Sequence, residues 1–93
     1  MRMYRVEYVY AGDELIETIQ HDVDWASLRA FRKRVLSKLD EWYLKDRWDN
    51  LSTVDKGKLN SYRQALRDLP QDYSGENANE AVDNWPEAED WFL

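Results

Sequence analysis

Two segments of the sequence repeat apolar residues every three or four positions, and this spacing limits the fold more than any other feature. Such residues fall on one face of an α-helix, so each segment predicts an amphipathic helix. We expect the first helix over residues 24–45 and the second over residues 52–68. The apolar stripes are Trp25, Leu28, Phe31, Val35, Leu39 and Trp42 in the first, and Leu59, Tyr62, Leu66 and Leu69 in the second. The two helices should pack as an antiparallel pair, because each stripe has to be covered.

The predicted helix ends carry the expected capping residues. Asp22 or Asp24 can cap the first helix. The run Ser52-Thr53-Val54-Asp55 resembles a capping box at the start of the second, although Gly57 weakens the following turn by about 1 kcal/mol relative to Ala. Pro70 cannot continue a helix and disfavours helical geometry at Leu69, so we expect the second helix to stop near residue 68.

Residues 2–20 alternate in a different way, with a period of two. Tyr4, Val6, Tyr8 and Tyr10 share one face, the turn signal Ala11-Gly12-Asp13 follows, and residues 15–20 read as a second strand. This pattern predicts a β-hairpin. A lone hairpin is barely stable in water, so its aromatic face should pack on the following helix.

The expected fold class is therefore α+β and mainly helical: a hairpin, an antiparallel two-helix pair and an extended C-terminal arm. At 93 residues the chain is one small domain, which we place at residues 1–70, with the arm at 71–93. There is no cysteine to add a disulfide, so five Trp, six Tyr and two Phe have to supply much of the buried apolar area.

Charge is distributed unevenly along the chain, whose net charge is -6. Residues 71–93 carry seven Asp or Glu and no Lys or Arg, whereas the helical middle is mildly basic. Binding to nucleic acid needs clustered basic residues against phosphates, so we expect no nucleic-acid partner. No signal peptide is present and no apolar run approaches the length of a membrane span, so we expect no membrane partner.

The residues that carry catalysis or bind metals are sparse. The single histidine, His21, lies beside Asp22, and we read it as a linker residue. No Gly-x-Ser-x-Gly elbow, phosphate-binding loop, zinc spacing or calcium-loop pattern is present. We expect no enzyme activity, catalytic residue, cofactor or metal.

Several residues remain as candidates for binding a partner. Arg63 and Arg67 lie four apart beside the second stripe, and either pair within the chain or bind a partner's carboxylates. Trp85-Pro86 either docks the chain's own arm or presents an exposed aromatic side chain. The partner-binding candidates are Arg63, Arg67, Pro70, Trp85, Pro86, Trp91 and Phe92, and the residues expected to support the fold are Tyr62, Leu66 and Leu69.

The run Tyr62-Arg63-Gln64-Ala65-Leu66-Arg67-Asp68-Leu69-Pro70, followed by Trp85-Pro86, resembles the C-terminal segment of the bacteriophage tail assembly chaperone-like family. Arg34-Val35-Leu36, Asp40-Glu41-Trp42 and Leu51-Ser52 extend the resemblance over residues 28–86. It implies a non-enzymatic structural or assembly component that binds a phage tail or tail-fibre protein. The place of action would be the virion tail or the host cytoplasm during assembly.

The acidic C-terminal residues motivate an alternative from another class. A small acidic phage inhibitor could mimic DNA and block a host nuclease or defence complex. Such a mimic should spread negative charge over a folded face. Here the acids gather in the predicted arm and the helices are slightly basic, so the assembly role is preferred.

Overall fold

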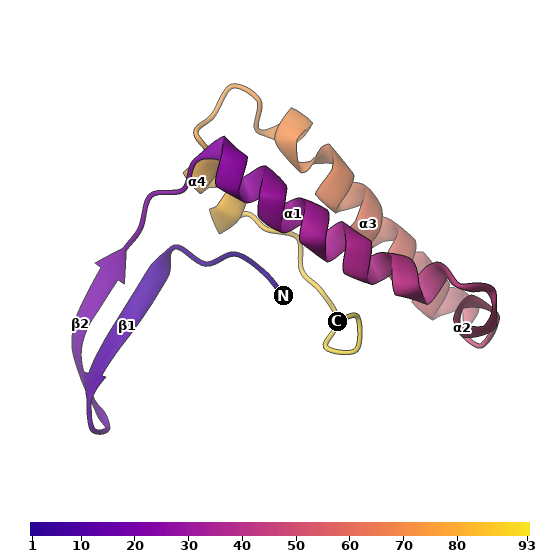
Figure 1. The fold of residues 1–93 in the computed structure, drawn as a ribbon, viewed down its shortest axis with the longest axis horizontal. Coiled ribbons are helices and arrows are strands. Elements are labelled where there is room, and N and C mark those ends of the chain that lie inside the picture. The colour runs from indigo at the N-terminus through magenta and orange to yellow at the C-terminus, as the bar shows by residue number, and fades with distance from the viewer.

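The computed structural model describes residues 1–93 and confirms a mainly helical α+β fold (Figure 1). The elements are β1 (Val6–Ala11), β2 (Glu14–Gln20), α1 (Trp25–Leu39), the 3-10 turn η1 (Asp40–Tyr43), α2 (Lys45–Asp49), α3 (Thr53–Asp72) and α4 (Ala78–Asp83). The two strands form an antiparallel hairpin whose turn contains Gly12 at a φ of 62°. Glycine reaches this left-handed region without strain.

The long helices α1 and α3 lie side by side and run in opposite directions (Figure 1). Arg32 on α1 donates to the carbonyl oxygen of Leu66 over 3.3 Å, and Tyr43 donates to Asn60 over 3.0 Å. The residue numbers on α3 fall as those on the first segment rise. The expected antiparallel helix pair is therefore present.

Both predicted caps are confirmed at the starts of these helices. A carboxylate oxygen of Asp24 accepts from the backbone N–H of Ser27 at 2.7 Å, and the Ser52 hydroxyl accepts from that of Asp55 at 3.1 Å. The first helix is shorter than predicted. It ends at Leu39, and the expected stretch to residue 45 is replaced by η1 and the start of α2.

The second helix continues past the predicted stop near residue 68 and includes Pro70. Proline has no N–H to donate to the carbonyl of Leu66 four residues earlier. The guanidinium of Arg32 donates to that same oxygen. A side chain from α1 thus replaces the hydrogen bond that proline removes.

The core draws on more of the chain than the helix pair. Its twelve buried residues are Leu28, Val35, Leu39, Leu59, Tyr62, Leu66, Leu69, Ala78, Ala81, Val82, Trp85 and Phe92. The extended arm expected over residues 71–93 needs correction. Residues 78–83 form α4, and Trp85 and Phe92 lie against Phe31 and Tyr62 with ring centroids 5.6 and 5.2 Å apart. The apolar edges of the helix pair bury these rings, which is more favourable than leaving them in water.

The expectation that the hairpin's aromatic face packs on the first helix is wrong. The hairpin projects from the helical body, and no residue of β1 or β2 is buried (Figure 1). The C-terminal segment supplies the buried rings beside α1 and α3 instead.

Candidate partner-binding surface

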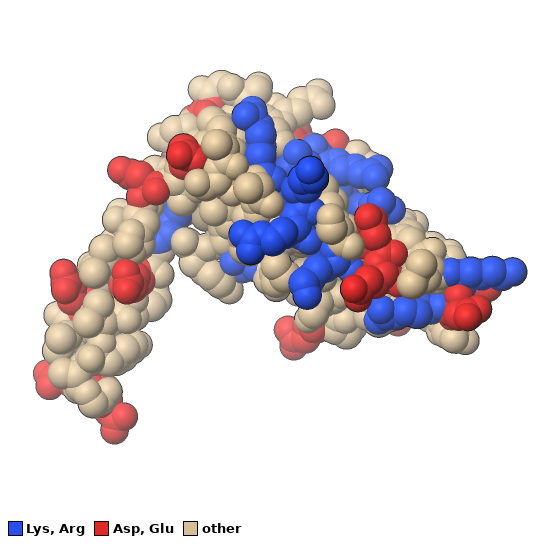
Figure 2. Space-filling model, viewed as in Figure 1, with Lys and Arg blue, Asp and Glu red and all other residues tan.

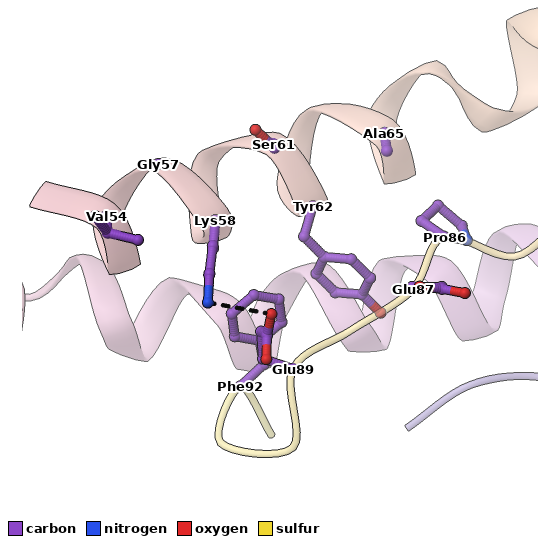
Figure 3. A pocket seen from close by; sticks show the side chains of 10 residues that line it. All are labelled: Val54, Gly57, Lys58, Ser61, Tyr62, Ala65, Pro86, Glu87, Glu89 and Phe92. Atoms are coloured by element: carbon purple, nitrogen blue, oxygen red, sulfur yellow. Dashed lines mark ion pairs between the residues drawn. The ribbon is translucent and has the colours of Figure 1, made fainter.

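A groove runs between α3 and the C-terminal segment and has a volume of about 480 Å³ (Figure 3). The helix contributes Val54, Gly57, Lys58, Ser61, Tyr62 and Ala65, and the C-terminal segment contributes Pro86, Glu87, Glu89 and Phe92. Residues spaced by three and four positions lie on one side of a helix, which is why α3 presents this set together. The groove thus combines apolar surface with charges at its edge.

The aromatic floor of the groove is fixed by hydrogen bonds. Trp85 Nε1 donates to the Tyr62 hydroxyl over 3.3 Å, and Trp42 Nε1 donates to the carbonyl oxygen of Phe92 over 2.6 Å. Burial raises the pKa of the Tyr62 hydroxyl above its usual value, and the hydrogen bond from Trp85 partly offsets this. The Tyr62 hydroxyl in the floor therefore stays protonated and uncharged at neutral pH.

One ion pair crosses the groove. Lys58 Nζ lies 3.4 Å from Glu89 Oε1, and both side chains are about half exposed (Figure 3). Exposed pairs of this kind contribute about 0–1 kcal/mol, so this contact can open at little cost.

Two further hollows continue from the groove, the first beside it and the second beside the first. One, of about 560 Å³, is lined by the first residues of the chain, including Arg2 and Tyr4, and by residues 86–90, 92 and 93. The other, of about 490 Å³, is lined by residues 2–6, Tyr8, Val82 and Asp83. The groove and the first hollow share four lining residues of the C-terminal segment, and the first hollow shares Arg2 and Tyr4 with the second. We call them together the concave surface, and Figure 2 shows the recess between the hairpin and the helical body.

Tyrosines make up the hairpin's part of the concave surface. Tyr4 and Tyr8 are 73% and 59% exposed, and Tyr10, on the same strand face as Tyr8, is 57% exposed. Sequence reasoning assigned these rings to the core and so missed them as candidates. The signal that could have identified them is the surplus of aromatic residues over what one pair of helices can cover.

The base of the hairpin is held against α4. Arg5 Nε and Nη2 donate to the two carboxylate oxygens of Asp83 at 2.9 and 2.8 Å. The hydrogen bond from Arg5 lowers the pKa of the Asp83 carboxyl and raises that of the guanidinium. Asn79 accepts from the backbone N–H of Val23 at 2.7 Å and donates to Asp22 at 3.0 Å. These contacts fix the direction in which the hairpin projects.

The predicted partner-binding residues divide into buried and accessible sets. Trp85 and Phe92 are buried. Phe92 and Pro86 line the groove, and Trp85 contacts it only through its hydrogen bond to Tyr62. Trp91 is half-buried and packs edge-on against Trp42 at 5.2 Å. The three residues expected to support the fold, Tyr62, Leu66 and Leu69, are all buried.

The remaining candidates, Arg63, Arg67 and Pro70, all lie on α3, but each has different surroundings. Arg63 donates to Asp40 at 2.9 Å and lies over the ring of Tyr43, 4.5 Å from its centroid. Arg67 is exposed and forms no ion pair. Pro70 is half-buried within the helix. The structure therefore groups Pro86 and Phe92 at the groove, places Trp85 against Tyr62 of its floor, and leaves Arg67 open to solvent.

The single histidine, which was considered for acid–base chemistry, makes one side-chain contact, and that contact is exposed. His21 Nε2 lies 2.9 Å from Glu7 Oε2, and both side chains are more than half exposed. No group of three or more His, Cys, Asp and Glu side chains is placed to hold a metal ion. None of the helices combines the length and the apolar character that crossing a membrane requires.

Comparison with known proteins places the helical part of the chain in one family. No curated protein and no solved structure matches the sequence. The family model described as phage tail assembly chaperone protein matches residues 25–89, more than half of the chain and slightly more than the resemblance over residues 28–86 covers. The match includes α1 to α4 and most of the groove, and leaves the hairpin outside. The chain therefore belongs to the phage tail assembly chaperone family.

Proposed function

We propose that the protein acts without catalysis in phage tail assembly, by binding a tail or tail-fibre protein on its concave surface. The observation that carries this proposal is that exposed tyrosines, Tyr4 and Tyr8, line the hollows that continue from the groove along α3, whose floor is aromatic. Exposed apolar patches bordered by polar residues are typical of protein-binding sites, and tyrosine is enriched at binding hot spots.

The charges around the concave surface favour a partner with basic residues. Glu87, Glu89 and Asp90 are exposed along it, and only Glu89 has a basic partner within the chain. Complementary charges raise association rates and select partners. A partner lysine or arginine could displace Lys58 from Glu89, because that exposed pair is weak.

Among the candidate residues, we assign direct contact to Pro86, with Trp85 and Phe92 supporting it from below. Arg67 offers a planar donor group to a partner's carboxylate. Arg63, Pro70 and Trp91 would contribute through the shape of the helix pair. The place of action would be the host cytoplasm during assembly or the tail of the finished particle.

Paired co-expression with each tail and tail-fibre protein of the same phage tests the proposal. We expect one of them to co-purify, and expect Tyr4→Ala with Tyr8→Ala to weaken that complex by at least about fivefold, since hot-spot truncations cost more than about 1 kcal/mol. Leu44→Ala is the matched control, because Leu44 is 61% exposed and lies outside the concave surface. If no tail protein co-purifies, or if both variants bind equally well, the proposal is wrong.

A further inference from the structure

The hairpin has a second face, opposite its tyrosines, that is acidic. Residues paired across antiparallel strands lie on the same face. One set of pairs is Glu7 with Ile19, Val9 with Glu17 and Ala11 with Glu14. This acidic face therefore presents three carboxylates around a small apolar centre. Residues 6–20 contain no Lys or Arg to neutralise them.

The outward side of α1 has the opposite charge. Ala26, Ala30 and Ser37 are exposed at helical spacing and form a smooth strip along its middle. Two pairs of cations border this strip, Arg29 with Lys33 on one side and Arg34 with Lys38 on the other. We call this surface the basic face, and Figure 2 shows the basic side chains gathered over α1.

The charges of both faces find few partners within their own chain. Glu14 and Glu17 form no ion pair, and Glu7 contacts only the exposed His21, at 2.9 Å. None of the ion pairs in the structure uses Arg29, Lys33, Arg34 or Lys38. The hairpin points away from α1 (Figure 1), and the contacts of Arg5 with Asp83 hold it in that direction. A chain therefore cannot place its acidic face on its own basic face.

We propose that a second copy of this chain occupies the basic face, with the acidic face of one copy's hairpin docked on α1 of the next. The carboxylates of Glu7, Glu14 and Glu17 meet the two rows of cations, and the apolar centre of the hairpin face meets the strip of small residues. Docking also stabilises a two-stranded hairpin that is marginal alone. A pair formed in this way keeps one free hairpin, on one copy, and one free α1, on the other, so the contact is head-to-tail and extends to an open chain or closes as a ring. The concave surface stays free for the tail protein.

Sedimentation velocity of the purified full chain tests this proposal over a range of concentrations. At an ionic strength of about 0.1 M, where the Debye length is about 10 Å, the weight-average mass should rise with concentration. At about 1 M salt, where that length is about 3 Å, the rise should disappear. A monomer at all concentrations up to about 200 µM at the lower salt would overturn the proposal, because the dissociation constant would then be too high for a specific contact.

Charge reversal identifies the two faces. Glu14→Lys with Glu17→Lys, and separately Lys33→Glu with Lys38→Glu, should each raise the dissociation constant at least about tenfold. An equimolar mixture of the two variants should associate again, because each then presents the charge that the other lacks. Asp72→Lys with Glu76→Lys changes the net charge by as much as the hairpin reversal but alters no residue of either face, and this variant should associate at least as well as the unmodified chain. Association that survives either reversal, or that mixing fails to restore, would overturn the proposal. All of these side chains are exposed, and far-UV circular dichroism checks that each variant is folded.

Discussion

Arg32 and Pro70 both determine how one group, the carbonyl oxygen of Leu66, is hydrogen-bonded. Pro70 cannot donate to it, and Arg32 Nη1 does so from α1 at 3.3 Å. Replacing Arg32 with Met keeps most of the apolar stem and removes the guanidinium. Replacing Pro70 with Ala returns a backbone N–H that can bond to Leu66. The two substitutions should therefore be strongly coupled.

The magnitude follows from the geometry. A hydrogen bond from a charged donor contributes about 1.5–3 kcal/mol, and the 3.3 Å length and partial exposure of Arg32 favour the lower end of that range. Arg32 Nε is buried without a partner, and its removal offsets part of the loss. We expect Arg32→Met to lower the free energy of unfolding by about 1–1.5 kcal/mol. In the Pro70→Ala background the same change should cost less than about 0.5 kcal/mol, because the backbone now supplies the bond.

Urea unfolding followed by tryptophan fluorescence measures all four variants of this cycle. The coupling energy should be about 1 kcal/mol, above the deviation of about 0.3–0.5 kcal/mol seen for independent sites. Lys33→Met is the matched control, because Lys33 is an exposed cation on the same helix with no partner in the structure. Equal costs of Arg32→Met in both backgrounds would refute the reasoning that the arginine replaces the missing N–H.

Three further substitutions test other parts of the structure. Gly57→Ala should raise the free energy of unfolding by about 1 kcal/mol in urea titrations, because an added Cβ meets nothing within 4 Å and alanine favours helix; destabilisation would contradict this. Phe92→Ala should lower it by about 3–5 kcal/mol, and a loss below about 1 kcal/mol would mean that the C-terminal segment does not complete the core. Because Arg5 lowers the pKa of Asp83 in the folded chain, the stabilisation from this pair should be present above the unfolded carboxyl pKa of about 3.9 and disappear as the pH falls through the lower folded pKa. Asp83→Asn should remove this pH dependence and speed amide exchange at the hairpin base near Arg5 and His21, and unchanged exchange would contradict that role.

Local signals in the sequence predicted the parts of the fold that depend on neighbouring residues. The caps at Asp24 and Ser52 are present as expected, because each rests on contacts within four residues. The apolar stripes of both long helices are also present, except that Trp42 of the first stripe lies in η1. The sequence also carried a capping signal at Asn77, because asparagine is a preferred N-cap residue. In the structure its side-chain oxygen accepts from the N–H of Glu80 at 3.3 Å. Its acidic surroundings hid α4 from sequence reasoning.

Long-range contacts account for what the sequence did not predict. The extension of α3 through Pro70 depends on Arg32, which is far away in the chain. Either the hairpin or the C-terminal segment could have covered the helix pair, and local patterns do not distinguish these outcomes. The same choice decided the candidate site, because it placed Phe92 in the floor of the groove and left the tyrosines of the hairpin accessible.

The contacts of Arg2 and Arg5 with α4 have a consequence for how the chain is synthesised. They join residues about eighty positions apart, through Arg2 to the Val82 carbonyl and Arg5 to Asp83. During translation α1 and α3 both emerge before the segment that covers them. Their apolar faces are exposed to water until residues 78–92 follow, and such intermediates are prone to aggregate. Premature termination after α3 should therefore yield insoluble protein rather than a smaller working domain.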